Sequence, residues 1–196
     1  MKPLYPLAAL VAASALVIST SAQAHLVFYQ GTFAPEAVGA TGTGTLRLEY
    51  DDEGHTLAIS AIWSGLSGTT SNAHIHCCTP APRTGTAGVA LAQAGLLPGF
   101  PLLVNAGSYI RTINLSQTDQ YSAAYLTASG GTAAGAESRL LSNLASGNAY
   151  FNIHTTTFGG GEIRTFVTAV PEPGSLALLL AAAGLAAVAT RKKQGV

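Results

Sequence analysis

The sequence predicts a mainly β protein: an antiparallel, Greek-key-like β-sandwich with one short helix, flanked by an N-terminal signal peptide and a C-terminal transmembrane helix. Short segments of alternating apolar and polar residues follow one another between residues 26 and 168, as is typical of strands separated by turns. Only one segment in that stretch has helical spacing, and an apolar run lies near each end of the chain. We therefore expect a signal peptide at 1–24, a sandwich domain at 25–169 and a membrane segment within 170–196.

Residues 1–24 are typical of a secretory signal peptide. Lys2 supplies the positive charge near the start, and the largely apolar run of 12 residues from Leu7 to Ile18 is too short to span a bilayer. Ala22-Gln23-Ala24 fits a cleavage site, which would leave His25 as the first mature residue. A buried N-terminal helix is the alternative, and it is disfavoured because no amphipathic pattern follows.

The segments Gly44–Tyr50 and His55–Trp63 predict a β-hairpin. Both alternate apolar and polar residues, and the turn-forming sequence Asp51–Gly54 separates them. Other short segments are rich in β-forming residues and predict further strands: Leu26–Gln30, Asn72–His76, Gly88–Ala92, Tyr109–Leu115, Ala123–Leu126, Ala149–His154 and Glu162–Thr168.

The segment Ala133–Leu144 predicts the single helix. Its leucines fall on one helical face, and it contains few β-forming residues. Thr132 is placed to cap the first turn, and Gly147 is placed to end the helix in a left-handed conformation.

The C-terminal segment has three parts in a fixed order. Val170-Pro171-Glu172-Pro173 comes first, and Gly174–Thr190 follows as 17 residues without a charge. Arg191-Lys192-Lys193 lies three residues from the end of the chain. Seventeen uncharged residues predict a short transmembrane helix, and the basic cluster predicts that its C-terminal side stays in the cytoplasm.

This tail resembles the PEP-CTERM sorting signal of Gram-negative bacteria. The residues that carry the resemblance are Val170, Pro171, Glu172, Pro173, Arg191, Lys192 and Lys193. The resemblance implies processing by exosortase, a membrane transpeptidase-like enzyme that acts near the Pro-Glu-Pro. It also implies an exported protein of the cell surface or extracellular matrix, anchored transiently in the inner membrane. A plain C-terminal membrane anchor is the alternative.

The composition excludes several classes of function. Charged residues make up only 9% of the chain, against about 25% in typical soluble domains. Between His25 and Val170 there are five basic and eight acidic side chains, which excludes the basic surface that nucleic acid requires. The sequence contains no legible Ser-His-Asp or Cys-His arrangement and no phosphate-binding loop, so we expect neither an enzyme nor a bound cofactor.

Three histidines form the most suggestive cluster of chemistry-bearing residues. His74 and His76 share one face of a strand because side chains alternate at period two, and His154 lies on a second strand. Three histidines from two strands are candidate ligands for zinc or copper. The other interpretations are surface histidines without a special role, and a buried structural network, which we expect here. The members of that network would be His74, His76, Asn152, His154, Glu162 and Arg164.

The strands around these histidines resemble the CHRD domain, a module named after chordin. The matching segments, in the family's order, are Ala73–His76, Gly88–Leu91, Leu140–Gly147, Ala149–Thr155 and Gly160–Arg164. One departure is Thr165, where the family commonly has glycine. The resemblance covers the mature domain and implies its fold, but it implies no defined activity.

Cys77 and Cys78 are the two cysteines of the chain. Neighbouring Cα atoms lie about 3.8 Å apart across a trans peptide, which is below the usual disulfide range of about 4.4–6.8 Å. A vicinal disulfide, an intermolecular bridge and free thiols remain open. We expect the vicinal disulfide, because an exported chain meets an oxidising environment.

Together these patterns predict an exported surface or extracellular-matrix protein, sorted by exosortase, with a structural or adhesive binding role. The expected partners are exosortase, the membrane through the C-terminal helix, and surface polysaccharide or other matrix proteins. The alternative is a secreted metal-binding protein or metalloenzyme that uses His74, His76 and His154.

Overall fold

A computed structural model describes residues 25–171 of the chain. The signal peptide predicted at 1–24, the transmembrane helix predicted from Gly174 onward and most of the sorting residues lie outside this range. Among the residues that are described, no helix is both long and apolar enough to cross a membrane.

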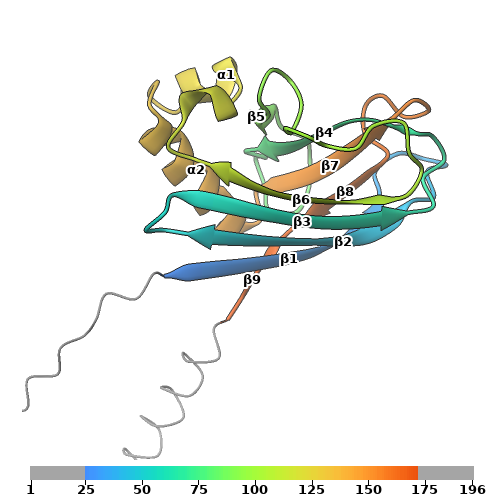
Figure 1. The fold of residues 1–196 in the computed structure, drawn as a ribbon, viewed down its shortest axis with the longest axis horizontal. Coiled ribbons are helices and arrows are strands. Elements are labelled where there is room, and N and C mark those ends of the chain that lie inside the picture. Colours follow the sequence, from blue (N-terminus) through green and yellow to red (C-terminus); the bar gives the residue numbers. More distant parts are fainter. Residues whose placement is uncertain (1–24, 172–196) are drawn as a thin grey trace, which may run out of the picture.

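The described chain forms one curled antiparallel sheet rather than two separate sheets (Figure 1). The strand order is β5-β4-β7-β8-β1-β2-β3-β6, and β9 pairs with β1. The strands are β1 (Leu26–Pro35), β2 (Thr43–Asp51), β3 (Thr56–Ser64), β4 (Thr70–Cys77), β5 (Val89–Leu91), β6 (Gly107–Asn114), β7 (Ala149–Thr155), β8 (Ile163–Phe166) and β9 (Thr168–Val170).

Strand β1 joins the two halves of the sheet. Residues 26–33 pair with β2, and the last two residues of the strand, Ala34 and Pro35, pair with β8. The half that contains β2, β3 and β6 therefore continues directly into the half that contains β4, β7 and β8. The two expected sheets are linked because one ten-residue strand is long enough to pair on both sides.

The predicted hairpin is present as β2 and β3. Leu48 pairs with Ile59 and Tyr50 with Leu57, so buried apolar side chains face each other across the two strands. The carboxylate of Asp51 accepts hydrogen bonds from backbone N–H groups in the following turn, which fixes the reversal of the chain.

The helices differ in part from the prediction. Helix α2 (Ala133–Ser146) matches it: the Thr132 hydroxyl accepts a hydrogen bond from the N–H of Gly135, and Gly147 is left-handed with φ 76°. The predicted strand Ala123–Leu126 is wrong, because it lies in helix α1 (Ala123–Ala128). A 3₁₀ turn, η1 (Thr118–Gln120), precedes it, so the described residues contain more than the single helix expected.

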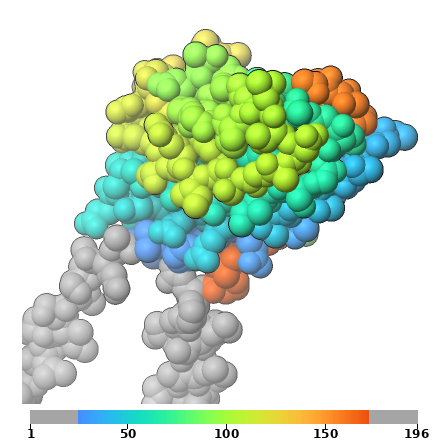
Figure 2. Space-filling view, turned by 45° about the vertical axis from the view of Figure 1, so that its right-hand side comes forward, coloured from blue at the N-terminus to red at the C-terminus, as the bar shows by residue number. Residues whose placement is uncertain are grey.

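The inner faces of the two halves meet in one apolar core. Phe33 packs edge-on against Phe151, with ring centroids 5.7 Å apart, and this contact joins the two halves. On β4, Ala73 and Ile75 point into the core. His74 and His76, which alternate with Ala73 and Ile75, therefore lie on the opposite face of the strand. Figure 2 shows another part of the surface, where β6 and the segment before it spread over one side of the molecule.

Candidate metal centre

Three histidines come together on the outer face of the sheet. His74 and His76 lie on β4 and His154 lies on β7, and the two strands are hydrogen-bonded neighbours. One nitrogen from each ring lies within 4.8 Å of the others. His74 Nδ1 and His154 Nε2 are only 3.2 Å apart. The strand pairing thus brings together the three histidines that the sequence marked as candidate ligands.

Backbone carbonyl groups hold the three rings. Each ring has one nitrogen at hydrogen-bonding distance from a carbonyl oxygen in a neighbouring loop: His74 Nε2 with Gly95 at 2.7 Å, His76 Nδ1 with Ala87 at 2.9 Å, and His154 Nδ1 with Gly159 at 2.9 Å. A carbonyl oxygen only accepts, so the nitrogen that faces it carries the proton. The three hydrogen bonds therefore assign one tautomer to each neutral ring.

The opposite nitrogen of each neutral ring is left with a free lone pair. These atoms are His74 Nδ1, His76 Nε2 and His154 Nε2, and the first and last of them are the pair that lies 3.2 Å apart. Within residues 25–171, His76 Nε2 is buried and has no hydrogen-bond partner. Metal-ligating histidines commonly donate their other N–H to a carbonyl or carboxylate in this way, which orients the lone pair toward the ion.

Burial keeps two of the rings neutral. It lowers the pKa of His74 to about 4, and the neighbouring histidines add to the effect. Burial also lowers the pKa of His76. At neutral pH these two rings therefore have lone pairs available for a metal ion.

Charged and polar side chains surround the cluster. The Asn152 amide nitrogen donates to a Glu36 carboxylate oxygen at 3.3 Å, and Arg164 Nη1 lies 3.4 Å from the other oxygen of Glu36. The Tyr150 ring stacks on the His76 ring, with centroids 4.8 Å apart. Glu36 was missed in the sequence because it lies 116 residues from Asn152 and carries no local signal. Tyr150 lies on the same face of β7 as Asn152, because side chains alternate along a strand.

Glu162 lies in a different network. Its carboxylate accepts hydrogen bonds from the N–H groups of Ser67 and Gly68 and from the hydroxyl of Thr155. Burial raises the pKa of Glu162, but these donors outweigh burial and hold the pKa below its usual value. Glu162 therefore anchors the loop after β3. This differs from the prediction, which placed Glu162 in the network of the histidines.

A disulfide joins Cys77 and Cys78 directly after His76 on the chain. No cysteine in the described range is free. Cys77 is buried in the core, with its Sγ atom 3.9 Å from the Tyr125 hydroxyl, and neither cysteine belongs to the cluster of the three histidines.

The donor set defines which chemistry the cluster supports. Three imidazole nitrogens, without a thiolate or carboxylate among the converging atoms, suit divalent zinc or copper better than calcium or magnesium. Because strand pairing and three carbonyl bonds position the rings, a metal ion would meet ligands that are already oriented.

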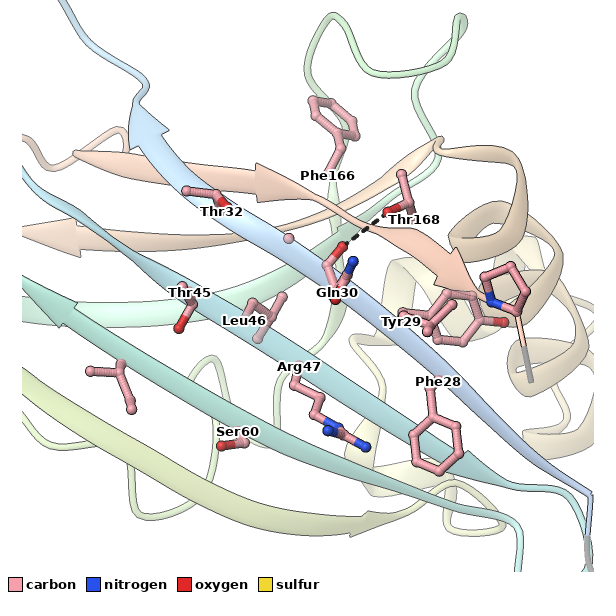
Figure 3. A pocket seen from close by; sticks show the side chains of 14 residues that line it. Phe28, Tyr29, Gln30, Thr32, Thr45, Leu46, Arg47, Ser60, Phe166 and Thr168 are labelled. Atoms are coloured by element: carbon pink, nitrogen blue, oxygen red, sulfur yellow. Dashed lines mark hydrogen bonds between the residues drawn. The ribbon is translucent and has the colours of Figure 1, made fainter. Parts of the chain in front are cut away.

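A separate groove of about 850 Å³ lies on the outer face of β1, β2 and β3 (Figure 3). The guanidinium group of Arg47 lies over the Phe28 ring, 4.9 Å from its centroid. Further along the groove, the hydroxyl groups of Thr32, Thr45 and Ser60 line it. Aromatic and hydrogen-bonding groups thus share this surface.

Two family models match the chain. The model of the CHRD domain matches residues 22–167, and that of the PEP-CTERM protein-sorting motif matches residues 169–193. Neither the curated proteins nor the solved structures gave a match. The sorting motif identifies an exported, cell-surface protein of a Gram-negative bacterium that exosortase processes. Since the first model covers most of its length, the chain belongs to the CHRD domain family.

Proposed function

We propose that this exported domain binds one divalent transition-metal ion through His74, His76 and His154. The observation that carries the proposal is the convergence of one nitrogen from each of the three rings, together with carbonyl bonds that leave His74 Nδ1 and His154 Nε2, 3.2 Å apart, without protons. The lone pairs need a hydrogen-bond donor or a cation, and a bound cation would meet this need. No hydrogen-bond donor within residues 25–171 reaches His76 Nε2.

The ion has a structural role in this proposal. It links β4 to β7, and through the carbonyl bonds it also steadies the loops that contain Ala87, Gly95 and Gly159. A ligand that binds only the folded state stabilises it by mass action. The metal would therefore strengthen a surface domain that works outside the cell.

Metal analysis and titration of the purified protein test this proposal. We expect one zinc or copper ion per chain and no stoichiometric binding by the variants His76→Ala and His154→Ala. His25→Ala is the matched control, because His25 is exposed and outside the cluster. Absence of saturable binding to the wild-type protein would refute the proposal.

A second proposal concerns the groove on β1, β2 and β3 and gives the adhesive role a physical basis. We propose that it binds surface polysaccharide, with Phe28 packing against sugar C–H groups and Arg47 donating to sugar hydroxyls. Phe28→Ala and Arg47→Ala should each reduce retention on polysaccharide from the producing cells. Ile110→Ala, an exposed apolar residue outside the groove, should not.

The sorting tail determines where these activities take place. We propose that the uncharged segment anchors the chain in the inner membrane until exosortase removes it, and that the released domain then joins the extracellular matrix. Support comes from the match of the sorting motif to residues 169–193, directly after the folded domain.

A further inference from the structure

We infer that Asn152 Oδ1 is the fourth ligand of the metal centre, which makes it a closed site of three nitrogens and one oxygen. The inference rests on the proposed binding of a metal by His74, His76 and His154. It goes further because it assigns the metal, which would be zinc, and because it leaves no coordination position for a substrate.

Strand pairing places Asn152 among the three histidines. It lies directly opposite His74 across the β4–β7 pair and two residues before His154 on the same face of β7. Only 1% of its surface is exposed. Its Oδ1 atom has no hydrogen-bond partner among the described residues, and the same is true of His76 Nε2. Two buried acceptors without donors thus occupy one small region of the sheet.

The amide of Asn152 is oriented by charge. A carboxylate only accepts hydrogen bonds, so the amide nitrogen must face Glu36, at 3.3 Å from its oxygen. Arg164 holds the other oxygen of Glu36 in place. The amide oxygen is then directed away from Glu36.

One pair of nitrogens already has a spacing that suits tetrahedral zinc, and the third nitrogen must move closer. With Zn–N bonds of about 2.05 Å, the 3.2 Å between His74 Nδ1 and His154 Nε2 corresponds to an angle of about 103° at the metal. The whole cluster spans up to 4.8 Å, so the rings must close by roughly 1.5 Å to reach zinc-bound spacing. Structural zinc sites have four protein ligands, whereas catalytic sites keep one position for water.

Three variants of the purified chain test the fourth ligand. Asn152→Leu removes the oxygen at similar volume, Asn152→Asp keeps an oxygen, and Asn114→Leu changes an exposed asparagine at the end of β6. We expect Asn152→Leu to weaken zinc binding by about 10- to 100-fold, measured by competition with a chelator. Asn152→Asp should keep binding within about tenfold, and Asn114→Leu should resemble the wild type.

Cobalt substitution separates a closed site from an open one. The wild-type Co²⁺ protein should show the intense visible bands of tetrahedral coordination, and azide should not alter them. Bands that shift with azide would show an exchangeable water ligand and overturn the inference. This measurement needs only the wild-type protein, so it decides the question even if the Asn152→Leu variant does not fold.

The two proposals fail in different ways. If the wild type binds neither zinc nor copper, the metal centre itself is refuted. If it binds copper alone, the metal centre stands and the assignment of zinc is refuted. If the wild type binds zinc and Asn152→Leu binds it equally well, the metal centre stands and the role of Asn152 is refuted.

Discussion

His74 Nδ1 lies 3.2 Å from His154 Nε2, although each is the nitrogen that its own carbonyl bond leaves without a proton. Two lone pairs at this distance repel unless a cation or a proton lies between them. Burial lowers the pKa of His74 to about 4, which disfavours the proton at neutral pH. The proposed metal ion, bound by both nitrogens, would remove this repulsion.

The first prediction is that zinc stabilises the protein. Binding to the folded state alone contributes about 2.7 kcal/mol at a zinc concentration of 100 times Kd, which corresponds to a rise in melting temperature of roughly 5–10 °C. Differential scanning fluorimetry with added zinc and then excess chelator checks this. A melting temperature that neither zinc nor the chelator changes would instead favour a purely structural network of histidines.

The second prediction separates packing from metal binding. His76→Ala leaves the Ala87 carbonyl without its donor and removes a ring that stacks on Tyr150. We expect the metal-free variant to melt several degrees below the wild type, because losing a buried hydrogen-bond partner costs about 1–3 kcal/mol. It should gain nothing from zinc. Equal gains from zinc in variant and wild type would contradict the assignment of His76 as a ligand.

The third prediction concerns pH. The pKa of His74 is about 4 in the folded protein, against 6.5 as the ordinary value, so the unfolded chain binds more protons between these values. The metal-free protein should therefore be most stable above pH 6.5 and lose stability as pH falls toward 4. Thermal melts across this range check the prediction. In His74→Gln the fall should be smaller, and an unchanged profile would show that another group is responsible.

The fourth prediction concerns Glu162. Replacing it by alanine leaves the N–H groups of Ser67 and Gly68 and the Thr155 hydroxyl without their acceptor in a buried position. We expect a loss of about 3 kcal/mol in the free energy of unfolding, measured by urea denaturation. Glu53→Ala, at an exposed position in the β2–β3 turn, should change stability by less than about 0.5 kcal/mol.

The fifth prediction concerns sorting. Because the PEP-CTERM motif matches residues 169–193, deletion of exosortase in the host should leave a heavier form that stays with the membrane fraction. Immunoblots of membrane and culture fractions from both strains check this. Equal mass and equal release in the two strains would show that the tail is not processed in this way.

Local periodicity predicted which side chains share a strand face, whereas long-range strand pairing determined which residues meet at the site. Alternation along the strand predicted that His74 and His76 share one face, opposite Ile75, and in the structure Ile75 lies in the core while the two rings, also buried, meet on the other face. The prediction that Glu162 lies in the histidine network is wrong. Strand alternation does not apply to this residue, because β8 begins only at Ile163 and Gly161, with a positive φ of 125°, turns the chain just before it.

The structure differs from the sequence prediction at two further places, one with a local cause and one with a distant cause. Ala123–Leu126 forms a helix because the Ser122 hydroxyl accepts from the N–H of Tyr125 and caps the first turn. Glu36 joined the site through the β1–β8 pairing that curls the sheet, and no sequence pattern near Asn152 reports that pairing. Sequence periodicity carries information along a strand but not across the sheet.

His154 follows His74 by 80 residues, and β7, which carries it, is followed only by β8 and β9 in the described chain. The histidine cluster therefore exists only after β7 has paired with β4 and closed a long loop. A chain that has not reached this pairing offers no such cluster to an ion. If the centre binds a metal as proposed, the composition of the compartment in which this pairing forms, as well as ligand chemistry, selects that metal.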